Sequence, residues 1–315
     1  MSTPAQIAGK VVVFTGNESK NWNDSTVQQT AQYIRSLGAD TICMKYADGG
    51  ISYHSPQTME RFHTLANREG AGLLGFQYCY GPAFAMPKQI QDEARIANNM
   101  AGYIPMVILD MEIEYDSKTD PAKQFRDLLT LVPAGKLAIT TWANPVRHNW
   151  VGIIEAFNQR QNMIWIPQKY TSFLDTQPEP GMNIIWPAID LSNEFGPNDP
   201  LAIIESDKPQ SAWVWNIPLA QRYTYCAQRL RDIAHFMHNG DIPDSPIPAI
   251  PTAIPVTRWP KKYGCLWDFA QLWHTSVEAV YQRNQEAIES AAKAHGLDNS
   301  QHGGIIFEGT TIQKP

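Results

Sequence analysis

The sequence predicts an α/β protein built on a closed (β/α)8 barrel, followed by a C-terminal proline-rich arm and a long helix. Two observations predict the barrel. Apolar runs of strand length alternate with stretches of helical apolar spacing, and eight such strands fall within about 240 residues, the usual size of this fold. An open doubly wound sheet is the alternative, but no Gly-x-Gly-x-x-Gly follows any predicted strand. The barrel is therefore the favoured architecture.

The first part of the chain shows a regular order of strand and helix. Residues 10–15 form a β-branched run that ends in a polar turn, and residues 25–37 show helical apolar spacing before Gly38 ends the helix. Two further strand–helix pairs are predicted at 41–46 and 56–69, then at 72–79 and 87–100. Loops of aromatic and small residues follow the second and third strands.

The alternation continues through the fourth strand, which begins at residue 104. The remaining predicted elements are helix 122–131, strand 136–142, helix 150–158 and strands 163–168, 182–189 and 211–217. An amphipathic helix at 220–238 ends at Asn239 and Gly240 and is expected to close the barrel.

Three regions are predicted: a barrel at 1–240, a proline-rich arm at 241–263 and a helical extension at 264–315. Proline recurs so often in the arm that we expect an extended segment rather than a helix or a strand inside a sheet. The extension contains one long predicted helix, 266–295, and one small edge strand, 303–308. The arm and helix are expected to mediate contacts in a homo-oligomer.

Composition excludes several classes of function. A net charge of -6 without a dense basic cluster argues against nucleic acid as a partner. Four cysteines far apart in the sequence predict neither a disulfide framework nor a zinc site, and we expect no cofactor. The N-terminal residues lack the features of a signal peptide and no apolar run is long enough to span a membrane, so we expect cytoplasmic synthesis, with release by a non-classical route left open.

An acidic segment ends the fourth strand. On alternating faces of a strand, Ile108, Asp110, Glu112 and Glu114 share one side, so three carboxyl groups follow one another on that face. Such neighbours oppose each other's ionisation and cost stability. A solvent-facing edge strand is one explanation, but the apolar residues before Asp110 indicate a strand buried on both faces that becomes charged only at its end.

The C-terminal ends of barrel strands gather at one mouth, which is where active sites of this fold lie. Aromatic, amide and carboxyl groups predominate there, as in sites that stack on sugar rings and bind hydroxyl groups. Trp165 and Trp213 are expected to be core residues instead. The candidate substrate-binding residues are Glu18, Lys45, Asp48, Gln77, Tyr78, Tyr80, Glu114, Trp142, Asn144, Gln168, Tyr170, Asp190 and Trp215.

The candidate catalytic residues are Asp110 and Glu112. Repulsion from Asp110 and Glu114 on either side is expected to raise the pKa of Glu112, which would then act as the general acid. Asp110 would stay ionised and orient the substrate or stabilise positive charge. The distance between the two carboxyl groups decides between retention and inversion, and the sequence does not fix it.

Several segments of the sequence, from residue 44 to residue 195, resemble in their type and order those of glycoside hydrolase family 25, the phage and bacterial muramidases. The family carries Lys-Ala-(Thr/Ser)-Glu-Gly, a Gly-x-Tyr-x-Phe strand, a Gln-Ala-rich helix and a Pro-x-x-x-Asp-x-Glu strand. The similar segments here are 44–49 with Tyr53, 72–80, 89–100, 105–112, 164–170 and 190–195. The resemblance implies a muramidase-like barrel acting on peptidoglycan, with Asp110 and Glu112 as its catalytic acids.

The resemblance has two departures. The family ends its first strand with an active-site Asp, for which this chain offers only Glu18 or Asp24, and Asp190 precedes the eighth strand rather than following it. A second hypothesis is therefore a catalytically inactive barrel that binds carbohydrate or serves as an assembly subunit. A third, a metal-dependent hydrolase using His235 and His238, is disfavoured because both lie on the closing helix, away from the mouth.

Overall fold

The computed structural model divides into two compact units, residues 1–191 with 198–246 and residues 192–197 with 247–315. The residues that the structure describes are 9–81, 89–111, 136–142, 164–168, 188–191, 200–207, 209–222, 224–241, 253–255, 266, 269, 276–294 and 310–315.

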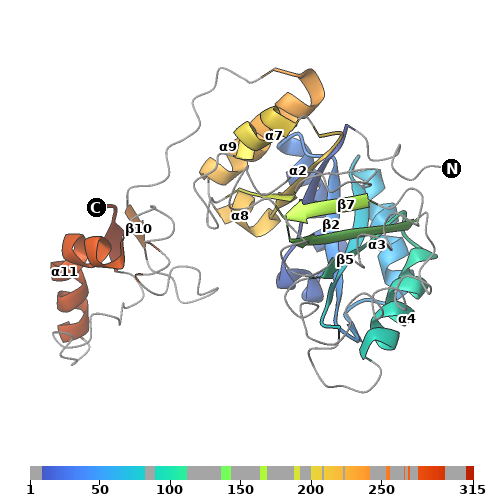
Figure 1. Cartoon of the computed structure of the whole chain (residues 1–315), viewed down its shortest axis with the longest axis horizontal. Coiled ribbons are helices and arrows are strands. Elements are labelled where there is room, and N and C mark those ends of the chain that lie inside the picture. The colour runs from blue at the N-terminus through green and yellow to red at the C-terminus, as the bar shows by residue number, and fades with distance from the viewer. Residues whose placement is uncertain are drawn as a thin grey trace. The chain divides into compact units, whose positions relative to one another are not determined.

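The first unit is a closed barrel of eight parallel strands, which confirms the predicted fold class (Figure 1). Strand β1 pairs with β2 on one side and with β9 on the other, so the sheet has no free edge around the ring. In ring order the strands are β1 (Val11–Phe14), β2 (Thr41–Asp48), β4 (Gly72–Cys79), β5 (Val107–Met111), β6 (Leu137–Trp142), β7 (Ile164–Gln168), β8 (Ala188–Asp190) and β9 (Ala212–Trp215).

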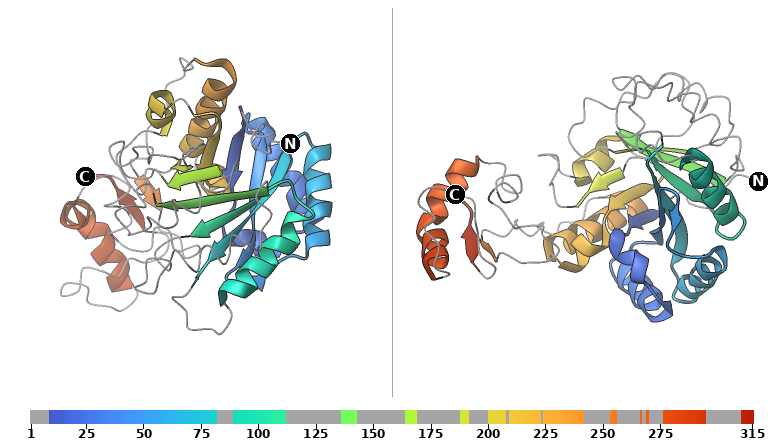
Figure 2. Two further views of the ribbon diagram at one scale, coloured as in Figure 1. Left: turned by 45° about the vertical axis from the view of Figure 1, so that its right-hand side comes forward. Right: turned by 90° about the horizontal axis from the view of Figure 1, so that it is seen from below.

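Three helices cover the outside of the first strands, as the two views of Figure 2 show. They are α2 (Asp24–Ser36), α3 (Pro56–Arg68) and α4 (Gln89–Ala101), close to the predicted ranges. Asn23 caps α2 by accepting a hydrogen bond from Thr26 N, and Ser55 caps α3 in the same way through Thr58 N. The apolar stripe of each helix is buried against the barrel, which is why these residues form helices here.

The closing region differs from the single helix predicted at 220–238. Two helices occupy it, α8 (Ile217–Arg222) and α9 (Thr224–Asn239), and α7 (Pro200–Asp207) precedes β9. Asn216 accepts a hydrogen bond from Leu219 N and so caps the short α8. At the other end of α9, His238 Nε2 lies 2.9 Å from Asp40 Oδ2, which holds the helix against the base of the barrel.

The strands alternate between the barrel interior and the helical layer. The interior cluster comprises Val12, Phe14, Cys43, Leu74, Phe76, Met106, Ile108, Ala138, Ile164, Ile166, Ala188 and Trp213, with Trp215 packed against it. Every second residue of a strand points inward. The residue two positions after a core residue therefore also points inward, nearer the C-terminal end of the strand and the mouth of the barrel. The interior is therefore a packed apolar core beneath the mouth.

A short hairpin that the sequence analysis did not predict extends β2. Strand β3 (Ile51–Ser52) pairs antiparallel with β2, bringing Ala47 opposite Ser52 and Asp48 opposite Ile51. Gly49 and Gly50 form its two-residue turn, and Gly49 has a φ of +56° that favours glycine. Before β2, the 3-10 helix η1 (Asn17–Asn21) follows the end of β1.

The second unit contains helix α11 (Val277–Ala294) and a two-stranded sheet of β10 (Ala253–Pro255) and β11 (Thr311–Gln313). The proline-rich arm was predicted to be an extended segment and neither a helix nor a strand inside a sheet. Within the arm, β10 is an edge strand of this two-stranded sheet, and Pro255 ends it. Asn284 is 4% exposed and ties the helix to the sheet, because it accepts from Gln313 N and donates to Gln313 O.

Several predicted elements lie outside the described residues. These are helices 122–131 and 150–158, strand 303–308 and most of the range from 266 to 275. Within the residues described, Cys43, Cys79 and Cys226 are buried free thiols. No helix in that part of the chain is long and apolar enough to cross a membrane.

Candidate functional site

Five of the predicted site residues occupy inward positions at the C-terminal ends of their strands. Each comes two residues after a core residue on the same strand: Lys45 after Cys43, Tyr78 after Phe76, Asp110 after Ile108, Gln168 after Ile166, and Trp215 after Trp213. Strand alternation therefore aims these side chains at the same mouth. We define these five residues as the mouth layer.

Asp110 is the buried acid of the mouth layer. It is 7% exposed, and its Oδ1 accepts a hydrogen bond of 3.1 Å from Gln168 Nε2 on β7. Strand register places Asp110 beside Tyr78 on one side and Thr140 on the other. Burial raises the pKa of the Cys43 thiol well above its ordinary value, and the nearby Asp110 charge raises it further, so Cys43 stays a neutral thiol beneath the carboxyl group.

Lys45 supplies a cation on β2, in the wall of the mouth that includes Tyr78. The residue is 7% exposed, and its Nζ lies 2.8 Å from Asn17 Oδ1 and 3.2 Å from Asp48 Oδ1. The same Nζ lies 5.3 Å from the centre of the Tyr78 ring. These contacts fix the ammonium group between η1, the β2–β3 hairpin and β4.

Tyr53 belongs to the same wall, although the prediction did not include it. The hairpin carries Tyr53 back toward β2, where its hydroxyl donates a hydrogen bond of 2.9 Å to Asp48 Oδ2. Burial, followed by this hydrogen bond to Asp48, raises the pKa of Tyr53 well above its ordinary value, so the hydroxyl remains a donor. The Gly49-Gly50 pair was a sequence signal for this hairpin.

Glu18 lies at the rim, on η1. Its carboxyl folds back over the backbone and accepts a hydrogen bond of 2.7 Å from Gly16 N. Burial raises the pKa of Glu18 above 4.5, and the hydrogen bonds from the backbone and the charge of Lys45 act in the opposite direction without cancelling it. Glu18 is thus a carboxyl group that keeps its proton to a higher pH than an ordinary glutamate.

The floor of the mouth is aromatic. Phe14 lies 5.3 Å from Phe76, 5.8 Å from Trp213 and 5.7 Å from Trp215, measured between ring centres. Trp213 is fully buried and Trp165 is 2% exposed, which confirms that both are core residues. Trp215 is only partly buried, so its ring forms the upper surface of this aromatic floor.

Gln77 does not belong to the mouth layer. It lies on the outer face of β4 with no exposed surface, where its Nε2 donates to Gly49 O at 3.0 Å and to Glu93 O at 3.2 Å. Its neighbours Tyr78 and Tyr80 are partly exposed, and their ring centres lie 5.2 Å apart. The two tyrosines form a wall beside Lys45, whereas Gln77 supports that wall from behind.

The remaining predicted site residues are not placed by side chain. Trp142 and Asp190 end β6 and β8, and only their backbones are described. The described residues contain no group of three His, Cys, Asp or Glu side chains that could hold a metal ion. The predicted residues outside the described part of the chain are Glu112, Glu114, Asn144 and Tyr170.

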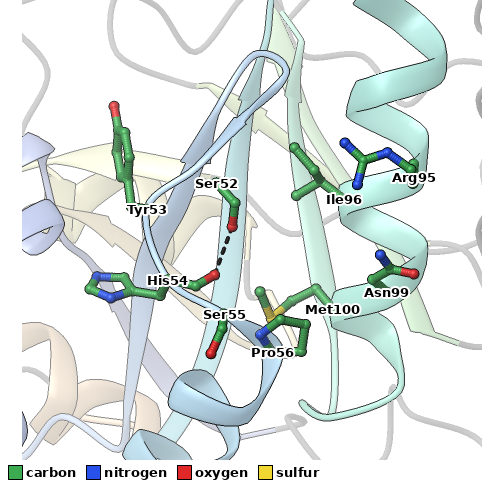
Figure 3. Close-up of a pocket in the computed structure, with 9 residues that line it drawn as sticks. All are labelled: Ser52, Tyr53, His54, Ser55, Pro56, Arg95, Ile96, Asn99 and Met100. Atoms are coloured by element: carbon green, nitrogen blue, oxygen red, sulfur yellow. Dashed lines mark hydrogen bonds between the residues drawn. The ribbon is translucent and has the colours of Figure 1, made fainter.

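A separate hollow of about 330 Å³ lies between residues 52–56 and α4 (Figure 3). Ile96, Asn99 and Met100 line it from the helix. In the close-up the Tyr53 ring points away from α4, in keeping with its hydrogen bond to Asp48. Tyr53 is one of the residues that line this hollow, and its hydroxyl is directed to Asp48.

Comparison with protein-family models and with curated protein sequences found no match. Among solved structures, a β-mannanase from Streptomyces thermolilacinus has a TM-score of 0.48 at 12% identity, covering 65% of this chain and 78% of that one. A xylose isomerase-like TIM barrel protein from Mycobacterium smegmatis has a TM-score of 0.47 at 10% identity, covering 76% and 99%. A D-allulose 3-epimerase from Methylomonas sp. has a TM-score of 0.47 at 10% identity, covering 74% and 96%.

Proposed function

We propose that this chain is a glycoside hydrolase-like protein that binds a polysaccharide in the barrel mouth and cleaves it by carboxylate acid–base chemistry. The observation that carries the proposal is the Asp110 carboxyl group, which is buried, faces inward and is held by Gln168 at the mouth. A buried acid costs stability unless its surroundings compensate. An acid retained at the ligand-binding end of a barrel is a functional candidate for this reason.

The surrounding residues suit a sugar. The partly exposed rings of Tyr78, Tyr80 and Trp215 offer flat apolar surfaces for the faces of sugar rings. Lys45, Asp48 and Asn17 form a polar cluster whose donors and acceptors match hydroxyl groups. This combination of flat rings and hydroxyl-matching groups favours a carbohydrate ligand.

Glycosidic cleavage needs one group that protonates the leaving oxygen and a second that supports positive charge at the anomeric carbon. We assign the first role to Glu112, which follows Asp110 by two residues, and the second to Asp110. Glu18 is a further proton-holding carboxyl group at the rim, since its pKa is raised by burial. Peptidoglycan is the proposed substrate because of the muramidase-like order of segments in the sequence.

The experiment measures reducing ends released from peptidoglycan and from soluble β-glycans by the purified protein. Glu112→Gln should reduce release by at least about 100-fold, the usual contribution of a general acid. Glu286→Gln is the matched control, because Glu286 is exposed on α11 in the second unit. Release that is equal in the wild type and in Glu112→Gln would overturn the catalytic assignment.

One observation favours a second candidate, a barrel that binds carbohydrate without cleaving it. No aspartate ends β1, the strand that ends in an active-site Asp in the muramidase family; Thr15 follows it, and its Oγ1 accepts a hydrogen bond of 2.9 Å from Lys45 N. That hydroxyl supports β2 from a fully buried position. Binding of a soluble glycan with no release of reducing ends would favour this candidate.

A further inference from the structure

A buried carboxyl group outside the mouth holds the loop that follows β4. Glu93 on α4 has no exposed surface, and its Oε1 accepts hydrogen bonds from Tyr80 N at 2.6 Å and Gly81 N at 3.2 Å. Gln89 Nε2 donates to the same oxygen at 2.9 Å. Three donors converge on this one carboxyl oxygen, so these contacts fix the backbone at the end of the strand.

The same network reaches the β2–β3 hairpin through Gln77. Tyr46 donates to Gln77 Oε1 at 3.1 Å, and Gln77 Nε2 donates both to Gly49 O and to Glu93 O. Tyr46, Gln77 and Glu93 are all fully buried. The β2–β3 hairpin and the loop that follows β4 are therefore both tied to α4 by fully buried groups.

The loop that Glu93 holds carries one of the two mouth tyrosines. Tyr80 packs over Gly49 so closely that a Cβ added at Gly49 would lie 2.5 Å from Tyr80 Cδ2. The Tyr80 ring also lies 5.2 Å from the Tyr78 ring in an edge-to-face arrangement. Two contacts thus hold the Tyr80 ring in place: the hydrogen bond from Tyr80 N to Glu93, and the packing of the ring against the hairpin.

We propose that Glu93 is a positioning residue for ligand binding, which holds Tyr80 and Tyr78 as a preformed stacking wall for one sugar ring. This inference rests on the proposed function, because it assumes that the mouth receives a carbohydrate. A wall ordered before binding spares the ligand the entropic cost of ordering it. Loss of the Glu93 contacts should therefore weaken binding more than it slows the chemical step.

The test compares Glu93→Gln with Glu60→Gln, an exposed glutamate on α3. In Glu93→Gln we expect amide hydrogen exchange at Tyr80 and Gly81 to accelerate by at least about tenfold, because the variant replaces one of the two carboxyl oxygens that accept from these amides by an NH2 group. With an N-acetylglucosamine hexamer as the probe, KM or Kd should rise about tenfold while kcat changes less than about twofold. Glu60→Gln should change neither the hydrogen exchange at Tyr80 and Gly81 nor the KM or Kd.

A second variant covers the case in which Glu93→Gln does not fold. Gly49→Ala keeps the Glu93 carboxyl group, but its Cβ would lie 2.5 Å from Tyr80 Cδ2 and 2.7 Å from Gln89 Nε2. It therefore displaces the Tyr80 ring and the Gln89 amide that donates to Glu93, and it should raise KM or Kd for the hexamer by a similar factor. Tyr80→Ala shows whether this tyrosine contributes to binding. If Tyr80→Ala weakens binding but a folded Glu93→Gln or Gly49→Ala binds as tightly as the wild type, the role of Glu93 is overturned and the proposed function still stands. If the wild type neither binds nor cleaves any glycan, the proposed function fails, and this inference fails with it.

Discussion

Two buried glutamines at strand ends show how the barrel divides its polar residues. Gln168 on β7 faces inward and donates to Asp110, whereas Gln77 on β4 faces outward and donates to Gly49 O and Glu93 O. Both side chains are hydrogen-bonded; Gln168 ends β7, and Gln77 lies two residues before the end of β4. The inner glutamine supports a carboxyl group at the mouth, and the outer one joins a hairpin to a helix. Strand alternation alone separates a site residue from a scaffold residue.

Of the two glutamines, the inner one should have the larger effect on activity. Gln168→Met keeps the side-chain volume but removes the donor to Asp110, so the rate of glycan cleavage should fall by about 10-fold to 100-fold. The free energy of unfolding should change by less than about 1 kcal/mol, because Asp110, the partner that remains in the variant, lies close to the open mouth. Initial rates and chemical denaturation on the same preparation measure both quantities.

The outer glutamine should show the opposite pattern. Gln77→Met leaves Gly49 O, Glu93 O and the Tyr46 hydroxyl without their partner in a fully buried layer, which should cost about 1–3 kcal/mol of stability. Activity at a temperature where the variant is folded should fall less than in Gln168→Met. A Gln77→Met variant that is as stable as the wild type but inactive would reverse the distinction between the two faces.

The smallest expected effect concerns Glu18 at the rim. Its pKa is raised by burial, so the folded state binds the proton more tightly than the unfolded state does, and the associated stability is lost as pH rises through the folded pKa. Glu18→Gln keeps an acceptor for Gly16 N and should be more stable than the wild type at pH 7, by at most about 0.5 kcal/mol at this solvent-screened position. The difference should disappear below about pH 4.5, and thermal denaturation at pH 4 and pH 7 tests this. A constant difference at both values would contradict the raised pKa.

Much of the barrel was predictable because its signals are local. Strand 72–79 was predicted with the bounds that β4 has, and the alternation within the fourth strand correctly placed Ile108 and Asp110 on the same face. Apolar periodicity also gave α2, α3 and α4 within a few residues. These features depend on a residue's immediate neighbours in the sequence, which is why a single sequence suffices for them.

The site was less predictable, because it depends on details beyond strand ends. Gln77 was grouped with Tyr78 by position, although neighbours on a strand point to opposite faces. A register shift between Lys45 and Ala47 on β2 breaks strict alternation, and strand periodicity cannot forecast it. The burial of Glu93 could not be predicted from the sequence. A glutamate in an amphipathic helix is expected to be exposed, and only the structure shows that Glu93 is buried beside the loop that it binds.

The central claim is that the Asp110 carboxyl group acts on a polysaccharide in the mouth. The most direct measurement is the initial rate of reducing-end release from peptidoglycan by the wild type and by Asp110→Asn, with Glu286→Gln, an exposed change on α11, as control. We predict a fall of about 100-fold or more in Asp110→Asn, with folding intact and the control unaffected. Equal rates in the wild type and a folded Asp110→Asn would contradict the claim.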